Sequence, residues 1–188
     1  SIGGERSVGT WGVANLRNGT PVVRDTMFLA GSVTKAMTAS LVALLVADGL
    51  VQLDIPIVAY VPDFEVADAE ASNTITVRHL LTHVSGLRPD IDVADEWIGY
   101  DTAIQRAIEE VPTSPPGQRF VYSDINFFLL GEIVARIAGM PLDQFARQRV
   151  VAQGVADLRF VQDVGQLLGA QQRHGGHRDG AGLDHRQP

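Results

Sequence analysis

Residues 32–49 read SVTKAMTASLVALLVADG and form the most apolar stretch of this chain. The run from Ala36 to Ala47 has the length of a helix and almost no polar face, and Gly49 behind it is a typical helix stop. A helix that is apolar all round is buried. The pattern therefore predicts a core helix that is buried on most sides.

Ser32 and Lys35 open this helix, and Lys35 is the only lysine among the fifteen Lys and Arg residues. Residues three apart share one helix face, which places the hydroxyl beside the amine. Burial lowers the pKa of an ammonium, and a neutral amine accepts a serine proton, as an activated nucleophile requires. Two interpretations are open: Ser32 is a nucleophile with Lys35 as its base, or Ser32 is a helix N-cap and the single lysine reflects a composition that favours arginine.

The composition argues against several classes of protein. With 188 residues and 45% hydrophobic content, the chain can bury a core and holds one domain or part of a larger one. A net charge of −7 and a pI near 5.1 argue against a nucleic-acid partner, because phosphate binding needs clustered cations. The absence of cysteine removes disulfides and thiolate chemistry. The longest apolar run is too short to span a bilayer.

Residue 1 is serine and no signal-peptide pattern precedes it, so we expect either a removed leader or a fragment. The compartment and the oligomeric state stay open.

Turn and capping signals predict the other elements. Asn18-Gly19 predicts a hairpin of two antiparallel strands within residues 1–28, and the prolines of residues 50–64 predict an irregular connection. The expected later helices are 77–83 capped by Thr76, 102–110, 125–138 capped by Asp124 and ended by Gly139, and 141–150. The acidic segment 88–101, with Trp97 and Tyr100, is a surface loop or a lid over a site.

The histidines do not indicate a metal site. His79 and His83 have i, i+4 spacing, but zinc proteases need a glutamate directly after the first histidine, and Leu80 stands there. His174 and His177 lack a third ligand at a useful spacing. No G-x-S-x-G elbow, P-loop or complete dinucleotide fingerprint occurs, so no cofactor is expected.

Four motifs follow one another within residues 8–160: FLAGSVTKAMTA at 28–39, DGLVQLD at 48–54, ITVRHLLTHVSGL at 75–87, and PG at 116–117 with YSD at 122–124. Together they resemble the serine β-lactamase and penicillin-binding-protein superfamily, in particular its class C β-lactamase and family VIII esterase branch. S-x-x-K alone is a common pattern, but several motifs in this order are far more specific.

The resemblance implies an α+β, β-lactamase-like fold, with an antiparallel sheet, flanking helices and a helical region. It implies a serine hydrolase that forms an acyl-enzyme on a small-molecule ester, β-lactam or D-alanyl amide. It also implies Ser32 as the acylated nucleophile, Lys35 as its proton acceptor, and Tyr122 as a partner base that serves deacylation. Residues 83–87 match a family turn to which we assign no chemistry.

The chain departs from the family pattern at Asp124, where asparagine is common and substrate binding is implied. An ionised carboxylate cannot donate to a substrate carbonyl, which favours an ester over a β-lactam. A carboxylate near Lys35 also favours the ammonium and opposes the activation argued above.

The second departure is that nothing in residues 140–188 resembles the family's late K-T-G or H-x-G strand, which supplies an oxyanion donor. We therefore expect a partial domain over 1–162 with an incomplete sheet. A poorly ordered Gly/His/Arg-rich tail over 163–188 should follow it. The alternative function is a truncated, non-catalytic remnant or ligand-binding module.

Overall fold

The computed structural model describes residues 7–66, 68–92 and 98–151 of a chain that divides into two compact units, residues 1–30 and 31–188. The predicted domain boundary near residue 162 and the predicted tail over 163–188 lie outside the described residues, as does Trp97. The boundary and the tail therefore stay predictions.

The first unit carries the predicted hairpin. Strand β1 (Val13–Asn15) pairs antiparallel with β2 (Thr20–Pro21) through an irregular register. The turn is closed by a hydrogen bond of 2.9 Å from the Gly19 N–H to the Asn15 carbonyl, and Gly19 has a φ of +69°. The strands are shorter than the alternating pattern indicates.

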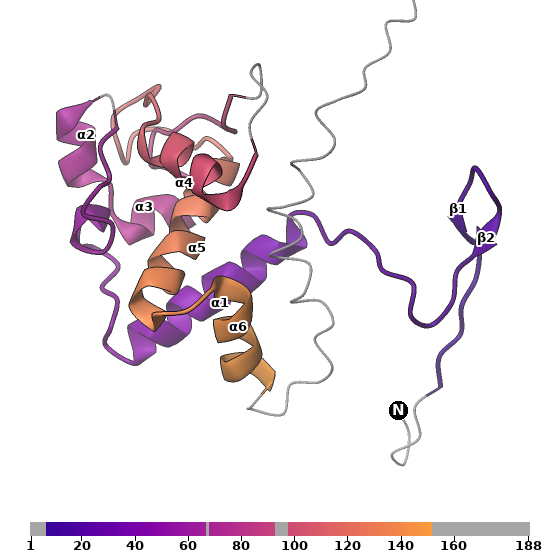
Figure 1. The fold of residues 1–188 in the computed structure, drawn as a ribbon. Coiled ribbons are helices and arrows are strands. Elements are labelled where there is room, and N and C mark those ends of the chain that lie inside the picture. The colour runs from indigo at the N-terminus through magenta and orange to yellow at the C-terminus, as the bar shows by residue number, and fades with distance from the viewer. Residues whose placement is uncertain (1–6, 67, 93–97, 152–188) are drawn as a thin grey trace, which may run out of the picture. The chain divides into compact units, whose positions relative to one another are not determined.

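The second unit is built around α5 (Asp124–Ala138), which contacts α1 (Val33–Ala47), α3 (Val77–Leu81), α4 (Tyr100–Ile108) and α6 (Leu142–Ala146) (Figure 1). Five apolar side chains of α5 have no exposed surface: Ile125, Leu129, Leu130, Ile133 and Val134. The helix ends at Gly139 in the left-handed conformation, as predicted.

The predicted cap of α5 is wrong by one residue. Ser123 is the N-cap, and its hydroxyl accepts the Asn126 N–H at 3.4 Å. Asp124 is the first residue of the helix, and its side chain is free to interact elsewhere.

Helix α1 is less buried than its sequence predicts. Only Thr38, Leu41, Val42 and Leu45 are buried, and Val33 is 62% exposed. The expectation of burial on most sides is wrong because one stripe of α1 packs on α5, and the small side chains elsewhere on the helix lie at the surface. The stop at Gly49 is confirmed by its left-handed φ of +73°.

The other helices differ from prediction mainly at their ends. Helix α3 begins at Val77, directly after its predicted cap Thr76, but ends at Leu81 instead of His83. Helix α4 begins at Tyr100 instead of Thr102. Helix α6 gives way after Ala146 to η2 (Arg147–Val151), a turn of π-helix. The connection over 50–64 contains the 3₁₀ turn η1 (Ile57–Ala59), and the helix α2 (Ala69–Thr74), capped by Asp68, was not predicted.

In the described part of the chain, no single helix combines the length and hydrophobicity of a membrane span. The pair Asp124–Ala138 and Leu142–Arg149, bent by 73°, meets those criteria only when both members are taken together.

Candidate active site

Ser32 and Lys35 meet at the N-terminal end of α1, as the i, i+3 spacing predicts. The Lys35 Nζ donates a hydrogen bond to the Ser32 Oγ at 3.3 Å. Ser32 occupies the N-cap position, but its side chain makes no capping hydrogen bond. The geometry therefore does not support the interpretation of this hydroxyl as a cap, and the hydroxyl is directed at the amine.

Two further predicted residues converge on the same amine. Asp124, at the start of α5, places its Oδ1 2.6 Å from the Lys35 Nζ, and the two side chains are 15% (Lys35) and 29% (Asp124) exposed. The Tyr122 ring centroid lies 5.0 Å from the same nitrogen. The Phe127 ring centroid lies 5.7 Å from it and closes the cluster from α5. The structure thus brings Ser32, Lys35, Tyr122 and Asp124 together.

The charge on Lys35 results from opposing effects. Burial lowers the pKa of Lys35, whereas hydrogen bonds to Asp124 and Tyr122 and the charges of those groups raise it, and the resulting pKa lies above the ordinary value. The prediction that burial leaves a neutral amine is therefore wrong, because the contributions of Asp124 and Tyr122 together outweigh desolvation. Lys35 is an ammonium near neutral pH and a hydrogen-bond donor to Ser32.

The segment that carries Tyr122 is held by residues that follow α3. The Gly117 N–H donates to the Val84 carbonyl at 2.7 Å, and the Val121 N–H donates to the His83 carbonyl at 2.8 Å. The Ser123 hydroxyl donates to the Arg88 carbonyl at 2.5 Å. Backbone contacts on both sides therefore fix Tyr122 before α5 begins.

His83 lies against Tyr122, a contact that the sequence did not predict. Its ring stacks on the Tyr122 ring, with centroids 4.6 Å apart and planes inclined by 30°. Its Nδ1 accepts the Ser123 N–H at 3.0 Å. The sequence offered only the match of residues 83–87 to a family turn and the i, i+4 spacing from His79, which lacks the glutamate of a zinc site. The family turn to which we assigned no chemistry thus touches the cluster.

His79 has a different role from His83. The Thr76 hydroxyl accepts the His79 N–H at 3.2 Å, and the His79 Nδ1 accepts the Thr76 N–H at 3.3 Å, which completes a capping box. Within the described ranges, no three His, Cys, Asp or Glu side chains gather as metal ligands would.

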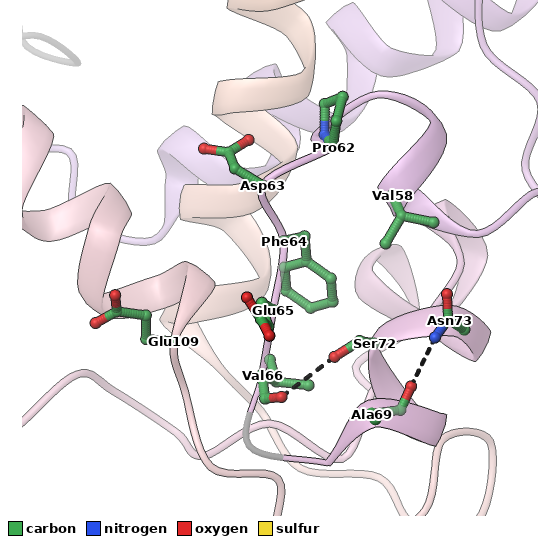
Figure 2. A pocket seen from close by; sticks show the side chains of 10 residues that line it. All are labelled: Val58, Pro62, Asp63, Phe64, Glu65, Val66, Ala69, Ser72, Asn73 and Glu109. Carbon is green, nitrogen blue, oxygen red and sulfur yellow. Dashed lines mark hydrogen bonds between the residues drawn. The ribbon is translucent and has the colours of Figure 1, made fainter.

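A separate pocket of about 670 Å³ lies in the second unit, between the segment 62–66 and α2 (Figure 2). Its serine and asparagine are already engaged: the Ser72 hydroxyl donates to the Val66 carbonyl at 3.2 Å, and the Asn73 amide donates to the Ala69 carbonyl at 2.8 Å. Asp63 is paired with Arg136. None of the pocket's lining residues belongs to the Ser32 cluster.

Comparison with known proteins gives a family match over nearly the whole chain. A family model described as Beta-lactamase matches residues 2–187. The chain is 34% identical to penicillin-binding protein 4 of Amycolatopsis lactamdurans in an alignment of 143 positions that covers 74% of this chain and 37% of that protein. It is 34% identical to esterase EstB of Burkholderia gladioli in an alignment of 170 positions that covers 80% of this chain and 42% of that protein.

A solved structure shows the same arrangement of elements. The structure of D-amino acid amidase from Ochrobactrum anthropi SV3 superposes with a TM-score of 0.62 and 31% sequence identity. The match covers 76% of this chain and 39% of the amidase chain. The chain thus spans about two fifths of the length of these three proteins.

Proposed function

This chain belongs to the beta-lactamase family and has a β-lactamase-like α+β fold, and on that premise we propose that it is a serine hydrolase in which Ser32 is acylated by an ester. The observation that carries the proposal is the convergence on Lys35: its Nζ lies 3.3 Å from the Ser32 Oγ and 2.6 Å from the Asp124 carboxylate. The names of the relatives, an esterase and an amidase among them, favour hydrolysis of a carbonyl compound.

Ser32 is the nucleophile in this proposal. Its Oγ bonds to the carbonyl carbon of the ester, and the bond from that carbon to the leaving alkoxide breaks. The Lys35 ammonium already donates to this oxygen, so its charge stabilises the oxygen as the proton departs. Ser32 stands at the exposed end of α1, where a substrate can reach it.

Tyr122, whose ring centroid lies 5.0 Å from the Lys35 Nζ, is the general base that takes the serine proton. We assign this step to Tyr122 because Lys35, which we first expected to accept the proton, is held in its charged form by Asp124. Tyr122 then protonates the leaving alkoxide. In the second half of the reaction Tyr122 removes a proton from water, whose oxygen bonds to the acyl carbon. The bond from that carbon to the Ser32 Oγ then breaks, and Tyr122 returns the proton to Ser32.

We favour an ester substrate because of Asp124. The position implies substrate binding by resemblance, but an ionised carboxylate only accepts hydrogen bonds, and this one is paired with Lys35. A substrate amide therefore gains no donor from it. A simple ester has no amide carbonyl that needs a donor at this position.

Labelling of Ser32 tests the proposal. The chain is incubated with a fluorophosphonate probe, and hydrolysis of p-nitrophenyl acetate is followed in parallel. We expect Ser32→Ala to abolish both signals, and Tyr122→Phe and Lys35→Ala to reduce both by at least about 10²-fold. Ser40→Ala is the matched control, because the Ser40 hydroxyl on the same helix only donates to the Ala36 carbonyl. Folded wild-type protein without Ser32-dependent labelling would refute the proposal.

A second function, binding without turnover, is favoured by one observation. Among the described residues of the second unit, the only β-pairing is an isolated bridge between Pro56 and Thr76, so no strand there presents an oxyanion donor. Loss of one such donor costs about 10²–10³-fold in rate. Stoichiometric labelling of Ser32 with no hydrolysis of p-nitrophenyl acetate would favour this second function.

A further inference from the structure

We propose that His83 is a positioning residue that holds Tyr122 against Lys35, and that it does so only as a neutral imidazole. The inference rests on the role proposed for Tyr122 and adds to it a second residue, His83. Three kinds of contact support it: two backbone hydrogen bonds, a ring stack and a network that fixes the imidazole.

His83 holds both chain neighbours of Tyr122. The Val121 N–H donates to the His83 carbonyl at 2.8 Å, and the Ser123 N–H donates to the His83 Nδ1 at 3.0 Å. One residue thereby fixes the backbone on either side of the tyrosine. The direction in which the Tyr122 side chain leaves the backbone follows from these two bonds.

The imidazole also packs against the tyrosine ring itself. The two rings are stacked at 4.6 Å, and the side chains of Phe120 and Phe127 contact the imidazole at centroid distances of 5.8 Å and 5.4 Å. The Lys35 Nζ lies 5.0 Å from the Tyr122 ring centroid. A displaced imidazole would therefore let the phenol move relative to the ammonium.

The tautomer of His83 follows from its partner. A backbone N–H only donates, so the Nδ1 that accepts the Ser123 N–H carries no proton, and the ring proton is on Nε2. The Asn126 amide nitrogen lies 3.3 Å from the same Nδ1, and the Asn126 Oδ1 accepts the Ser85 hydroxyl at 2.6 Å. Ser85 thus orients the Asn126 amide so that its nitrogen faces the imidazole.

The backbone of His83 is unusual. Its φ of +58° is the only positive value among the described non-glycine residues, and such a conformation is strained unless the surroundings stabilise it. Glycine would adopt this φ more easily but has neither an acceptor nor a ring. Asparagine also tolerates it and offers a side-chain acceptor, which makes asparagine the informative replacement.

Protonation would break the contact. Burial and the Lys35 charge on α1 lower the pKa of His83, and the Asp124 carboxylate on α5 opposes them without reversing the shift. The imidazole is therefore neutral at pH 7. Below its pKa, a proton on Nδ1 would face the Ser123 N–H, and two donors would oppose each other. Tyr122 would lose one of its two backbone supports.

The first test compares the pH dependence of fluorophosphonate labelling in three proteins. We expect the wild-type rate to fall about tenfold or more as pH drops through a midpoint below 6.5, the ordinary value for histidine. His83→Asn should keep labelling within about tenfold of wild type at pH 7.5 and lose that acid limb. His79→Gln, which preserves the capping box, is the control and should retain the wild-type profile.

The second test needs no catalysis. Nitrogen NMR of the wild-type chain should show a His83 Nδ1 without a proton, and the Ser123 amide signal should shift with the His83 titration. A protonated Nδ1 at pH 7, or a Ser123 amide that ignores the titration, would overturn the proposal. A fall of the His83→Asn labelling rate at acid pH that matches the wild type would also overturn the proposal. An inert chain with the expected NMR behaviour would refute the hydrolase function but leave the His83 contact standing.

Discussion

The charge on Lys35 depends on side chains that lie far from it in the sequence but close to it in space. The burial of Lys35 alone would favour a neutral nitrogen, but Asp124, at 2.6 Å, and Tyr122 together raise the pKa above its ordinary value. We expect Asp124→Asn to lower the pKa of Lys35 relative to wild type. Because Lys35 is the only lysine, selective nitrogen-15 labelling of lysine yields one side-chain signal whose titration gives this pKa directly.

The matched control is Asp54→Asn, which removes a carboxylate that pairs with Arg78. It should leave the Lys35 titration unchanged. Identical titration curves for Asp124→Asn and wild type would show that the carboxylate does not hold the ammonium, and Lys35 would return as the candidate acceptor for the serine proton.

The residues of the site differ in how far the sequence could predict them. Ser32 and Lys35 are neighbours because helix geometry fixes residues three apart, which needs no tertiary information. Asp124 was expected to act on Lys35 through the resemblance, but its ion pair could not be derived from spacing because the two residues lie far apart in the chain. His83 escaped prediction because its role depends on a left-handed backbone conformation, which no pattern in its neighbours indicates.

Among the elements, the segment after α3 supports the site through close backbone contacts at Gly86. The Gly86 carbonyl accepts the Thr113 N–H at 2.7 Å, and a Cβ on Gly86 would lie 2.0 Å from the Ser114 carbonyl oxygen. Gly86 also has a φ of +85°. We expect Gly86→Ala to lower the free energy of unfolding by about 2–4 kcal/mol, from backbone strain plus this clash.

Gly49→Ala separates the backbone strain from the steric clash. Gly49 has a φ of +73°, but nothing lies within 4 Å of a Cβ built there, so only the strain of about 1–2 kcal/mol should remain. Urea unfolding of both variants measures the difference. Equal losses at the two positions would contradict a close contact between Gly86 and Ser114.

The predictions of helices failed where the local sequence does not determine how deeply a helix is buried or whether a short helix forms. Apolar composition placed α1 correctly but overstated its burial, because composition does not tell how many neighbours a helix has. Helix α2 was missed because it is only six residues long and has no periodic apolar face. Capping signals performed better: Thr76 and Gly139 bound their helices as predicted, because caps act within one turn.

At the scale of the whole molecule, Tyr100 and Lys35 both make the stability of the folded chain fall at alkaline pH. Burial and a hydrogen bond to the Glu132 carboxylate, which accepts the Tyr100 hydroxyl at 2.5 Å, raise the pKa of Tyr100 above its usual value of 10.0. The neutral phenol is therefore favoured in the folded chain. The pKa of Lys35 is also raised, so its charged form is favoured there. Both groups contribute fully to the free energy of unfolding below their pKa values in the unfolded chain. These contributions are lost as pH rises through the pKa values in the folded chain.

We therefore expect the free energy of unfolding, measured by urea titration, to fall as pH rises above about 10. Tyr100→Phe removes a hydrogen bond to a charged acceptor, which should cost about 1.5–3 kcal/mol at pH 8 and flatten the alkaline loss. Asp124→Asn should flatten it further by the independent route through Lys35. Tyr60→Phe is the control, since the Tyr60 hydroxyl accepts the Gln52 N–H and bonds to no carboxylate in the described chain. Parallel pH profiles for wild type and Tyr100→Phe would contradict the assignment, because they would mean that Tyr100 titrates alike in the folded and unfolded chain.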